Sequence, residues 1–594
     1  MDRRRFTKGL GFIAVGLLIC ACGVAFHPHF QRDPTELSVE TQSQREWSEW
    51  TESSWAKLKP SKELKWVDCY PGGFECGRLQ MPLDYNKPEE ELAAIALIRL
   101  RANVSTDSTE YRGPILFNPG GPGGSGVDLI RGRGAMLAKV VGPQFDIVGF
   151  DPRGVSRSTP RVSFYESRVE RELWARSKLR ELNMSSDTVA SSWARNEITG
   201  ELAAQRDEHI LAHINTDHTA RDMLKITEAH GRKKLQYWGF SYGTVLGSTF
   251  AAMFPDNVER LVIDGVVDVT DDYYTAQWTT NLRDTDDVLQ WFFKDCLNAG
   301  PKDCAFYESS TEAMSSKLNK LYGAIIQSPV PVHTNTSYGI VDYARLRGTI
   351  FRTFYQPFNN WPRLATGLTE LMNGNGTMIY SMLDADRFQC SCDPLEKAFE
   401  GVEDAGTAIA CNDGDVVPSD LESAQEHYAN ILKISEWGSL WAGIRLACAS
   451  WPRIPKTQFR GPIAGNTSFP LLLIGNKADP VTPLWAAHTV SKGFPGSVVL
   501  SQDSVGHCSL SAPSVCTARV VREYFVNGTL PDAGTWCPID GSPFDPSNSS
   551  SIREFELGQD DAQTPLKGAE DGDLAEALRD LATFDDMRVP PLHV

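Results

Sequence analysis

The sequence lacks a basic surface patch, and this absence excludes one broad class of function. Its 58 Lys and Arg residues stand against 76 Asp and Glu residues, for a formal net charge of -18. Only the first eight residues are basic as a group. Because binding to phosphate backbones needs clustered Lys and Arg, we expect no nucleic-acid partner.

Three further features that the sequence lacks bear on its fold class and on metal binding. The 13 cysteines contain no paired Cys-x-x-Cys spacing of the kind that holds zinc. We find no internal repeat, and no part of the middle of the chain is poor in apolar residues. A hydrophobic content of 41% is typical of a folded globular protein, and 594 residues are too many for one compact core. We therefore expect one large domain with a big insertion, or two domains.

The N-terminus carries a targeting segment. Four basic residues between positions 3 and 8 precede an uncharged, mostly apolar run from 9 to 26. The run is long for the core of a signal peptide and short for a spanning helix, and Gly23-Val24-Ala25 offers a cleavage site. A cleaved signal peptide and a retained single-pass anchor both stay open. In either case the body of the protein faces the lumen or the exterior.

Sequons and cysteines independently favour export. Eleven cysteines lie beyond the targeting segment, and in an oxidising compartment they are expected to form disulfides, with an odd thiol left free or paired between chains. Several are closely spaced: Cys69 and Cys76, Cys296 and Cys304, Cys390 with Cys392 and Cys411, and Cys508 and Cys516. The Asn-x-Ser/Thr sequons are at Asn103, Asn183, Asn335, Asn375, Asn466, Asn527 and Asn548.

Short apolar runs of strand length predict an α/β fold with a mainly parallel sheet. Most of these runs are continuously hydrophobic, as strands buried on both faces must be, and helical stretches at 219–230 and 244–254 lie between them. The runs are Ile95–Leu100, Ile115–Phe117, Phe145–Phe150, Leu235–Gly239, Leu261–Val267, Leu471–Ile474 and Ser497–Leu500.

The distribution of predicted strands along the sequence also indicates the domain boundaries. The series of strands stops between 268 and 468, where a mostly helical cap insertion is expected, and it resumes afterwards. The predicted parts are a targeting segment 1–29, a surface leader 30–65, a core in two pieces 66–267 and 469–545, the insertion 268–468 between them, and an acidic flexible tail 546–594.

The segment Gly239 to Gly243 has the pattern of a nucleophile elbow. Small residues two before and two after Ser241 let the backbone turn sharply from strand to helix, which pushes the serine hydroxyl into the open. The five-residue pattern is weak by itself, since a chain of this composition yields roughly 0.3 copies by chance. The strand before it and the helical run after it supply the required context.

A glycine-rich loop from Asn118 to Gly126 follows another predicted strand. Backbone N–H groups of such a loop can converge on the oxyanion of a tetrahedral intermediate, and losing one donor costs about 3 kcal/mol of barrier. We assign one donor to Gly120 or Gly121 and the second to Tyr242. A phosphate or dinucleotide loop is the alternative, but no Lys-Ser/Thr closes the loop and its spacing is not that of a dinucleotide site.

The base and acid follow in the order Ser, Asp, His that the α/β-hydrolase fold uses. Asp479 and His507 each come just after a predicted strand. His488 and His593 also follow Asp479, but one lies in a helical run and the other in the tail. The rival acids are Asp264, which ends a strand, and Asp503, which lies close to His507; we interpret Asp264 as structural.

His209 and His213 are four residues apart on a predicted helix, a spacing that can seat a metal ion. No convincing third ligand accompanies them, so a solvated helix face is the preferred interpretation. We expect no metal and no cofactor.

Together these motifs resemble the tripeptidyl-aminopeptidase-like (TAP-like) branch of the α/β hydrolases, to which proline iminopeptidases are related. The resemblance rests on Tyr237–Thr244, the glycine loop, Phe150–Gly154 and the two segments around Asp479 and His507, and it runs from about 66 to 544. It implies a TAP-like segment at about 440–537, including Cys448 to Pro452. The chain departs from the family at its N-terminus and in its extended acidic tail. Asp151 and Arg153 we interpret as structural.

The resemblance implies peptide substrates cleaved from a free N-terminus, with acidic side chains of the insertion reading the α-amine. Which side chains do so stays open, as does the oligomeric state. An ester hydrolase with the same triad and a catalytically inactive binding protein are the alternatives. Epoxide hydrolases and dehalogenases need a carboxylate where this chain has Ser241.

Overall fold

The computed structural model describes residues 50–176, 181–183, 185–335, 337–383, 402–545 and 569–584. The chain divides into two units, 1–46 and 47–594, and every described residue belongs to the second. The targeting segment, Cys390, Cys392 and Asn548 lie outside the described residues.

One ten-stranded sheet organises the fold, in the order β1-β2-β3-β5-β4-β6-β7-β10-β11-β12. β1, β2, β3 and β5 pair antiparallel, and every pair from β5 through β4 to β12 is parallel. The prediction of an α/β fold with a mainly parallel sheet is confirmed. The strands are β1 (Val67–Cys69), β2 (Phe74–Pro82), β3 (Leu92–Leu100), β4 (Gly113–Asn118), β5 (Phe145–Phe150), β6 (Leu235–Phe240), β7 (Val258–Asp264), β10 (Leu472–Ala478), β11 (Val498–Val505) and β12 (Trp536–Cys537).

Helices cover both faces of this sheet, which explains the continuous apolar runs. All residues of β4, β5 and β6 are buried. Successive residues of one strand enter different cores: Leu116 belongs to one hydrophobic cluster, while Ile115 and Phe117 belong to the other. The helices packed on the sheet are α3 (Gly126–Val141), α6 (Thr216–Ala229), α7 (Tyr242–Met253), α17 (Leu484–Ser491) and α18 (Val515–Asn527).

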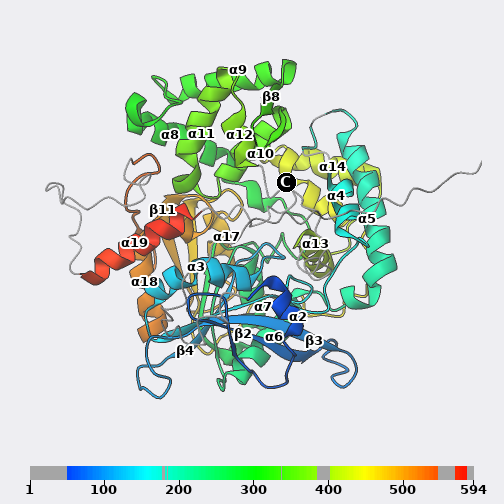
Figure 1. The fold of residues 1–594 in the computed structure, drawn as a ribbon, viewed down its shortest axis with the longest axis vertical. Helices are drawn as coiled ribbons and strands as arrows, with labels where there is room; N and C mark the ends of the chain where they lie inside the picture. The colour runs from blue at the N-terminus through cyan, green and yellow to red at the C-terminus, as the bar shows by residue number, and fades with distance from the viewer. Residues whose placement is uncertain are drawn as a thin grey trace, which may run out of the picture. The chain divides into compact units, whose positions relative to one another are not determined.

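Between β7 and β10 the regular secondary structure of the described chain is helical, apart from the small hairpin of β8 (Val330–His333) and β9 (Tyr338–Val341). Figure 1 shows α8 to α12 gathered at one end of the sheet, opposite β2, β3 and α6. The α-helices of the described chain between β7 and β10 are α8 (Thr285–Asp303), α9 (Thr311–Gln327), α10 (Tyr343–Thr353), α11 (Pro357–Met372), α12 (Thr377–Met382), α13 (Val402–Asp413), α14 (Leu421–Ile431), α15 (Gly438–Trp441) and α16 (Gly443–Ala447).

The helical layer also includes helices that precede the elbow in the sequence. α4 (Arg168–Arg176) and α5 (Thr188–Leu211) fall within the predicted first core piece, yet α5 packs against α14 and α16. Gly200 of α5 lies so close to the backbone of Ser450 that a Cβ there would come within 2.0 Å of its carbonyl oxygen. The insertion 268–468 is therefore not the whole of the helical layer.

Part of the segment that the sequence predicts to be a flexible tail is folded. Residues Ala569–Thr583 form α19, which packs on α3. Leu574, Leu578 and Leu581 are buried, and their spacing of three to four residues makes one apolar stripe on an otherwise acidic helix. The acidic composition concealed this periodicity.

The end of the predicted leader is packed as well. Trp55 of α2 (Glu52–Lys57) is 1% exposed, and its indole N–H donates to the Tyr70 hydroxyl at 2.8 Å. Glu52 of the same helix binds the Arg157 guanidinium at 2.8 Å. This part of the leader belongs to the folded core.

Disulfides occur as expected of an oxidising compartment, and two of the four among the described residues join cysteines that are close in sequence. Cys508 is free and buried. The pairs are Cys69–Cys76, Cys296–Cys304, Cys411–Cys448 and Cys516–Cys537.

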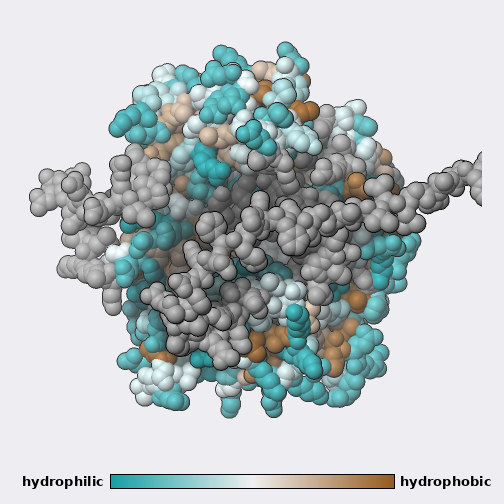
Figure 2. All heavy atoms as spheres, in the orientation of Figure 1, coloured by the Kyte–Doolittle hydropathy of each residue, from teal (hydrophilic) through white to brown (hydrophobic). Residues whose placement is uncertain are grey.

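Hydrophilic side chains cover most of the coloured surface in Figure 2, and apolar ones are scattered among them. Among the helices of the described ranges, none combines the length and apolar character needed to cross a bilayer.

Candidate active site

The predicted site residues all lie at the carboxyl ends of parallel strands. Ser241 follows β6, the glycine loop follows the adjacent β4, Asp479 follows β10, and His507 follows β11. Since parallel strands end at one edge of the sheet, the order of the strands gathers these segments on that edge.

Ser241 has the backbone of a nucleophile elbow. Its φ of 56° and ψ of -123° place it between β6 and α7 in a conformation that non-glycine residues rarely adopt. Its N–H donates to the Asp264 carbonyl at 3.0 Å, which fixes the turn to β7. The residue is partly exposed, as a nucleophile must be.

The two flanking glycines are required by close packing. A Cβ on Gly239 would lie 2.4 Å from the Gly243 carbonyl oxygen, and one on Gly243 would lie 2.8 Å from the carbonyl oxygen of Asn118. No side chain fits at either position without moving backbone, so the small-residue rule used at the sequence level has a direct steric cause here.

The glycine loop lies against Ser241, the predicted nucleophile. A Cβ on Gly120 would come within 2.3 Å of the Phe240 carbonyl oxygen and 2.8 Å of the Ser241 Cβ. The N–H of Gly120, which was one of two alternatives for the first oxyanion donor, already donates to the Asn118 side-chain oxygen at 2.9 Å. Within the described chain, the N–H groups of Gly121 and Tyr242 have no hydrogen-bond acceptor. The loop thus favours Gly121 over Gly120.

Asp479 and His507 meet directly. The His507 Nδ1 lies 3.0 Å and 3.1 Å from the two carboxylate oxygens of Asp479. The carboxylate is fully buried and the imidazole is 12% exposed. Asp479 also accepts the N–H groups of Val481, Thr482 and Cys508 at 2.9 to 3.0 Å. These bonds fix the carboxylate in place and keep it an acceptor.

One shared carbonyl connects the histidine loop to the elbow. The Asp264 carbonyl oxygen accepts both the Ser241 N–H and the Cys508 thiol, the latter at 3.4 Å. Within the described residues, no hydrogen bond joins the Ser241 hydroxyl to the imidazole. Such bonds are often long in free enzymes and shorten when substrate binds.

The rival acids are engaged elsewhere. The Asp264 carboxylate accepts the backbone N–H of Ser509 at 2.8 Å and its hydroxyl at 2.5 Å, and burial raises its pKa to about 6. Asp503 lies at the surface and pairs with Lys477 at 2.7 Å. Only Asp479 among the three carboxylates contacts the imidazole.

Two supports of His507 were missed at the sequence level. The Tyr355 carbonyl, at the junction of α10 and α11, accepts the His507 N–H at 2.9 Å, and the two rings meet edge to face at 5.0 Å. The Asn476 side chain donates to the carbonyls of Gly506 and Cys508 at 2.8 and 2.7 Å. The sequence does give one indication of the role of Asn476, because this residue lies two positions after the apolar run of a predicted strand.

Asp284, at the start of α8, was also missed. Its carboxyl accepts the backbone N–H of Asp479, and burial, together with the Asp479 charge, raises its pKa to about 7. Through this acid, the helical insertion contributes to the electrostatics around the predicted triad.

Asp151 and Arg153 have structural partners. Asp151 accepts the Ser125 hydroxyl and the backbone N–H groups of Val127 and Arg157. Arg153 binds Asp222 through two nitrogens at 2.6 and 2.8 Å. Both side chains tie loops to the sheet, away from the imidazole.

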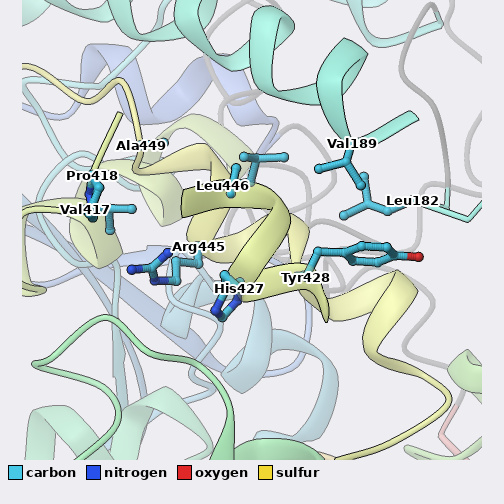
Figure 3. A pocket seen from close by; sticks show the side chains of 11 residues that line it. Leu182, Val189, Val417, Pro418, His427, Tyr428, Arg445, Leu446 and Ala449 are labelled. Carbon is cyan, nitrogen blue, oxygen red and sulfur yellow. The ribbon is translucent and has the colours of Figure 1, made fainter. Parts of the chain in front are cut away.

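A separate hollow lies between α5, α14 and α16, and no residue of the predicted triad lines it. In Figure 3, Leu182 and Val189 lie together on one side, and His427 and Arg445 lie next to each other. Burial and the neighbouring Arg445 lower the pKa of His427 to about 4. The lining of this hollow is mostly apolar and favours the packing of an apolar group over acyl-transfer chemistry.

Comparison with known families supports the resemblance. Residues 113–373 match the alpha/beta hydrolase fold family, and residues 433–537 match the family described as TAP-like protein. The second match begins slightly before the predicted start at 440.

Three curated relatives cover most of the chain. The serine protease Hip1 of Mycobacterium tuberculosis is 29% identical over 508 residues, which are 81% of this chain and 92% of the relative. The tripeptidyl aminopeptidase of Streptomyces lividans is 27% identical over 81% of this chain and 87% of its own length. Carboxylesterase B of Mycobacterium tuberculosis is 26% identical over 78% and 86%.

Proposed function

We propose that this chain, an α/β hydrolase with a TAP-like C-terminal segment, is an exported serine peptidase that removes short peptides or residues from free N-termini. The observation that carries the proposal is the His507–Asp479 pair, held at the same sheet edge as the elbow serine. The relatives named serine protease and tripeptidyl aminopeptidase, each matched along most of its length, support a peptide substrate.

In the proposed reaction Ser241 attacks the scissile carbonyl while His507 takes its proton. The buried Asp479 holds the Nδ1–H tautomer, so that Nε2 is the basic nitrogen, and it stabilises the imidazolium that forms. His507 then protonates the leaving amine. Water repeats the sequence on the acyl-enzyme and releases the N-terminal fragment.

The oxyanion would be held by the N–H groups of Tyr242 and Gly121. Tyr242 is the first residue of α7, so its N–H is one of the unpaired donors at the positive end of that helix. The Tyr242 side chain is anchored by a 2.6 Å hydrogen bond between its hydroxyl and that of Thr216. Donors fixed in this way need no reorganisation when charge develops.

Recognition of a free amine is proposed for the helical insertion. Tyr355 brings its backbone and ring onto His507, so the insertion reaches the catalytic base. When the scissile bond of a substrate lies at His507, the residues on the N-terminal side of that bond would lie against the helices of the insertion. Acidic side chains there would exclude longer chains by requiring a charged amine close to the cut.

Export is supported by disulfides and by the sequons. Within the described ranges there are four disulfides, and all six sequon asparagines there are exposed. Exposure is what glycosylation requires. We propose a lumenal or extracellular catalytic domain, released or held by the segment 9–26.

The deciding experiment compares a tripeptide chromogenic amide with its N-acetylated form, using purified protein. We expect acetylation to lower kcat/KM by roughly 10- to 100-fold, because a buried acid loses a charge-assisted contact and stays desolvated. Changing the substrate residue farthest from the scissile bond should have a smaller effect. Equal rates for the two forms would remove the aminopeptidase assignment and leave a general serine hydrolase.

An ester hydrolase is the second candidate, favoured by the relative named Carboxylesterase B. The same triad and oxyanion hole serve both reactions, so a panel of matched esters and amides must separate them. An enzyme of the proposed kind turns over the amides of free tripeptides. Hydrolysis of esters together with no turnover of any amide would favour the esterase.

A binding protein without activity is tested by a fluorophosphonate probe. An activated serine reacts with the probe, and Ser241→Ala should not. Absence of labelling in the folded wild-type protein would contradict an enzyme.

A further inference from the structure

A second group of polar side chains lies away from the predicted triad, where β2 ends and α6 begins. Asp84, His213 and His218 bring one ligand atom each to within 4.8 Å of one another. Asp84 follows β2, His213 lies in the turn between α5 and α6, and His218 is in the first turn of α6. His209, the partner that the sequence suggests for His213, is exposed and outside the group.

The tautomer of His218 is fixed by Asn215. The His218 Nδ1 lies 2.9 Å from the Asn215 side-chain oxygen, which can only accept, so Nδ1 carries the proton. The orientation of this amide is itself determined, because its nitrogen donates to the Ala212 carbonyl at 3.2 Å and its oxygen accepts the His218 backbone N–H at 2.9 Å. In the neutral ring, Nε2 therefore presents a lone pair.

That lone pair points at His213. The His218 Nε2 and the His213 Nδ1 are 3.4 Å apart, longer than the usual hydrogen bond of about 2.9 to 3.0 Å. Two nitrogens bound to one tetrahedral zinc ion at about 2.0 to 2.1 Å stand roughly 3.3 to 3.4 Å apart. The spacing of the two rings thus matches one edge of such a site.

The charges of the group are compatible with a cation. His213 and His218 are part-buried imidazoles, and a metal ion binds imidazole in its neutral form. Arg153 is nearby, but it is bound to Asp222 at 2.6 Å and to the carbonyls of Pro82 and Leu83. Asp84 supplies the negative charge, and one of its oxygens accepts the Asn86 N–H at 2.8 Å.

The other group with ligand spacing is less suited to a metal. Asp479, His507 and Cys508 also lie within 4.8 Å of one another. There the Nδ1 of His507 is bound to Asp479, which accepts three further N–H groups, and burial raises the pKa of the Cys508 thiol well above its usual range. A metal ion at that group would have to displace these partners, whereas among the described residues His218 Nε2 has a hydrogen-bond contact with the His213 imidazole alone.

We propose that Asp84, His213 and His218 form a binding site for a divalent transition-metal ion of the zinc class, with water in the fourth position. The donor set of two imidazoles and one carboxylate is one that zinc uses, and Asn215 has the role of the outer partner that orients a ligating imidazole. The ion ties the end of β2 to the turn that joins α5 to α6. Since α5 packs on α14 and α16, the tie anchors the helical layer to the sheet.

The test uses the full chain stripped with a chelator and titrated with Zn²⁺ or Co²⁺ as the only added metal. Wild type should take up one Zn²⁺ per chain at this site, gain thermal stability with Zn²⁺, and give the visible absorption of tetrahedral Co²⁺. His213→Ala should lower the affinity by about 100-fold or more. His209→Ala is the matched control, because it removes an exposed imidazole one helical turn earlier and should change nothing.

Asp84→Asn provides a second variant that keeps size and lowers affinity while leaving the imidazoles in place. Circular dichroism and hydrolysis of a chromogenic substrate establish that each variant is folded. The proposal is overturned if stripped wild type binds no Zn²⁺ at tenfold excess. It is equally overturned if folded His213→Ala keeps the wild-type affinity and Co²⁺ spectrum, since the ion then binds elsewhere.

Discussion

Two histidines of this protein differ mainly in what their Nδ1 contacts. In His507 it faces the buried carboxylate of Asp479 at 3.0 Å, and in His218 it donates to the neutral amide oxygen of Asn215 at 2.9 Å. Both bonds fix the same tautomer and leave Nε2 as the accepting nitrogen.

The difference between the partners determines what each ring can do. A carboxylate stabilises the imidazolium, so His507 can take a proton from Ser241 and hold it briefly. An amide offers no such charge, and Arg153 opposes protonation of His218. The first ring is suited to be a base, and the second is suited to stay neutral and bind a metal ion.

The largest expected effect in either region comes from removing the nucleophile. Ser241→Ala should lower kcat by about 10⁶-fold and abolish fluorophosphonate labelling, since the proposed base then has no hydroxyl to activate. The fold should persist, because the elbow is held by the backbone bond to Asp264 and not by the hydroxyl. Turnover above a trace in the folded variant would rule out Ser241 as nucleophile.

Asp479→Asn removes the negative charge beside His507. In contrast to Asn215, whose oxygen accepts from the ring, the new amide has its oxygen held by the N–H groups of Val481 and Thr482 and can turn its NH2 group to Nδ1. The amide should favour the wrong tautomer and withdraw the charge that stabilises the imidazolium, which lowers kcat by about 10⁴-fold.

Asp264→Asn is the matched control. Its carboxyl contacts Ser509 and not the imidazole, so we expect a smaller loss of activity and a change in stability. The reverse ranking would assign the catalytic acid to Asp264.

Acid should inhibit the enzyme through His507. Protonation removes the base, so kcat/KM should fall by up to tenfold for each pH unit below the midpoint. Asp284, with a pKa of about 7, gains a proton over the same interval, and Asp284→Asn separates the two contributions. A profile measured from pH 5 to 8 that stays flat in wild type contradicts a histidine base.

The same comparison shows what sequence could and could not predict. Strand endings, small residues and chain order selected Ser241, Asp479 and His507 as candidates, because the elbow and the parallel sheet constrain local sequence strongly. The strand β5 matches the predicted run to the residue. Contacts between distant segments leave no such pattern. Tyr355 reaches His507 from the insertion, and Asp84 joins His213 and His218 only because β2 ends beside α6.

The prediction for the C-terminal segment was wrong where it relied on amino-acid composition and not on the spacing of apolar residues. The acidic chain near the C-terminus resembled a solvated tail, yet three leucines spaced along one face dock α19 on α3. The choice between Gly120 and Gly121 also needed coordinates. Asn118 takes up the Gly120 N–H through a side-chain contact that the glycine pattern does not encode.

The smallest expected effect tests whether His218 stays neutral in the folded protein. Its pKa is about 2 when folded and roughly 6.5 when unfolded, so between these values the unfolded chain binds a proton that the folded chain does not. The free energy of unfolding therefore falls as the pH drops below about 6.5. His218→Gln should remove up to one proton from this slope, roughly 1.4 kcal/mol per pH unit.

The measurement is urea unfolding of metal-free protein at several pH values between 4 and 7. Asp264, whose raised pKa gives a slope of the opposite sign between about 4 and 6, is present in both proteins and cancels in the difference. His209→Gln is the control substitution, because it removes an imidazole that is exposed to solvent in the folded protein. Identical slopes for wild type and His218→Gln would mean that His218 titrates alike in both states. The contrast with His507 would then rest on geometry and not on charge.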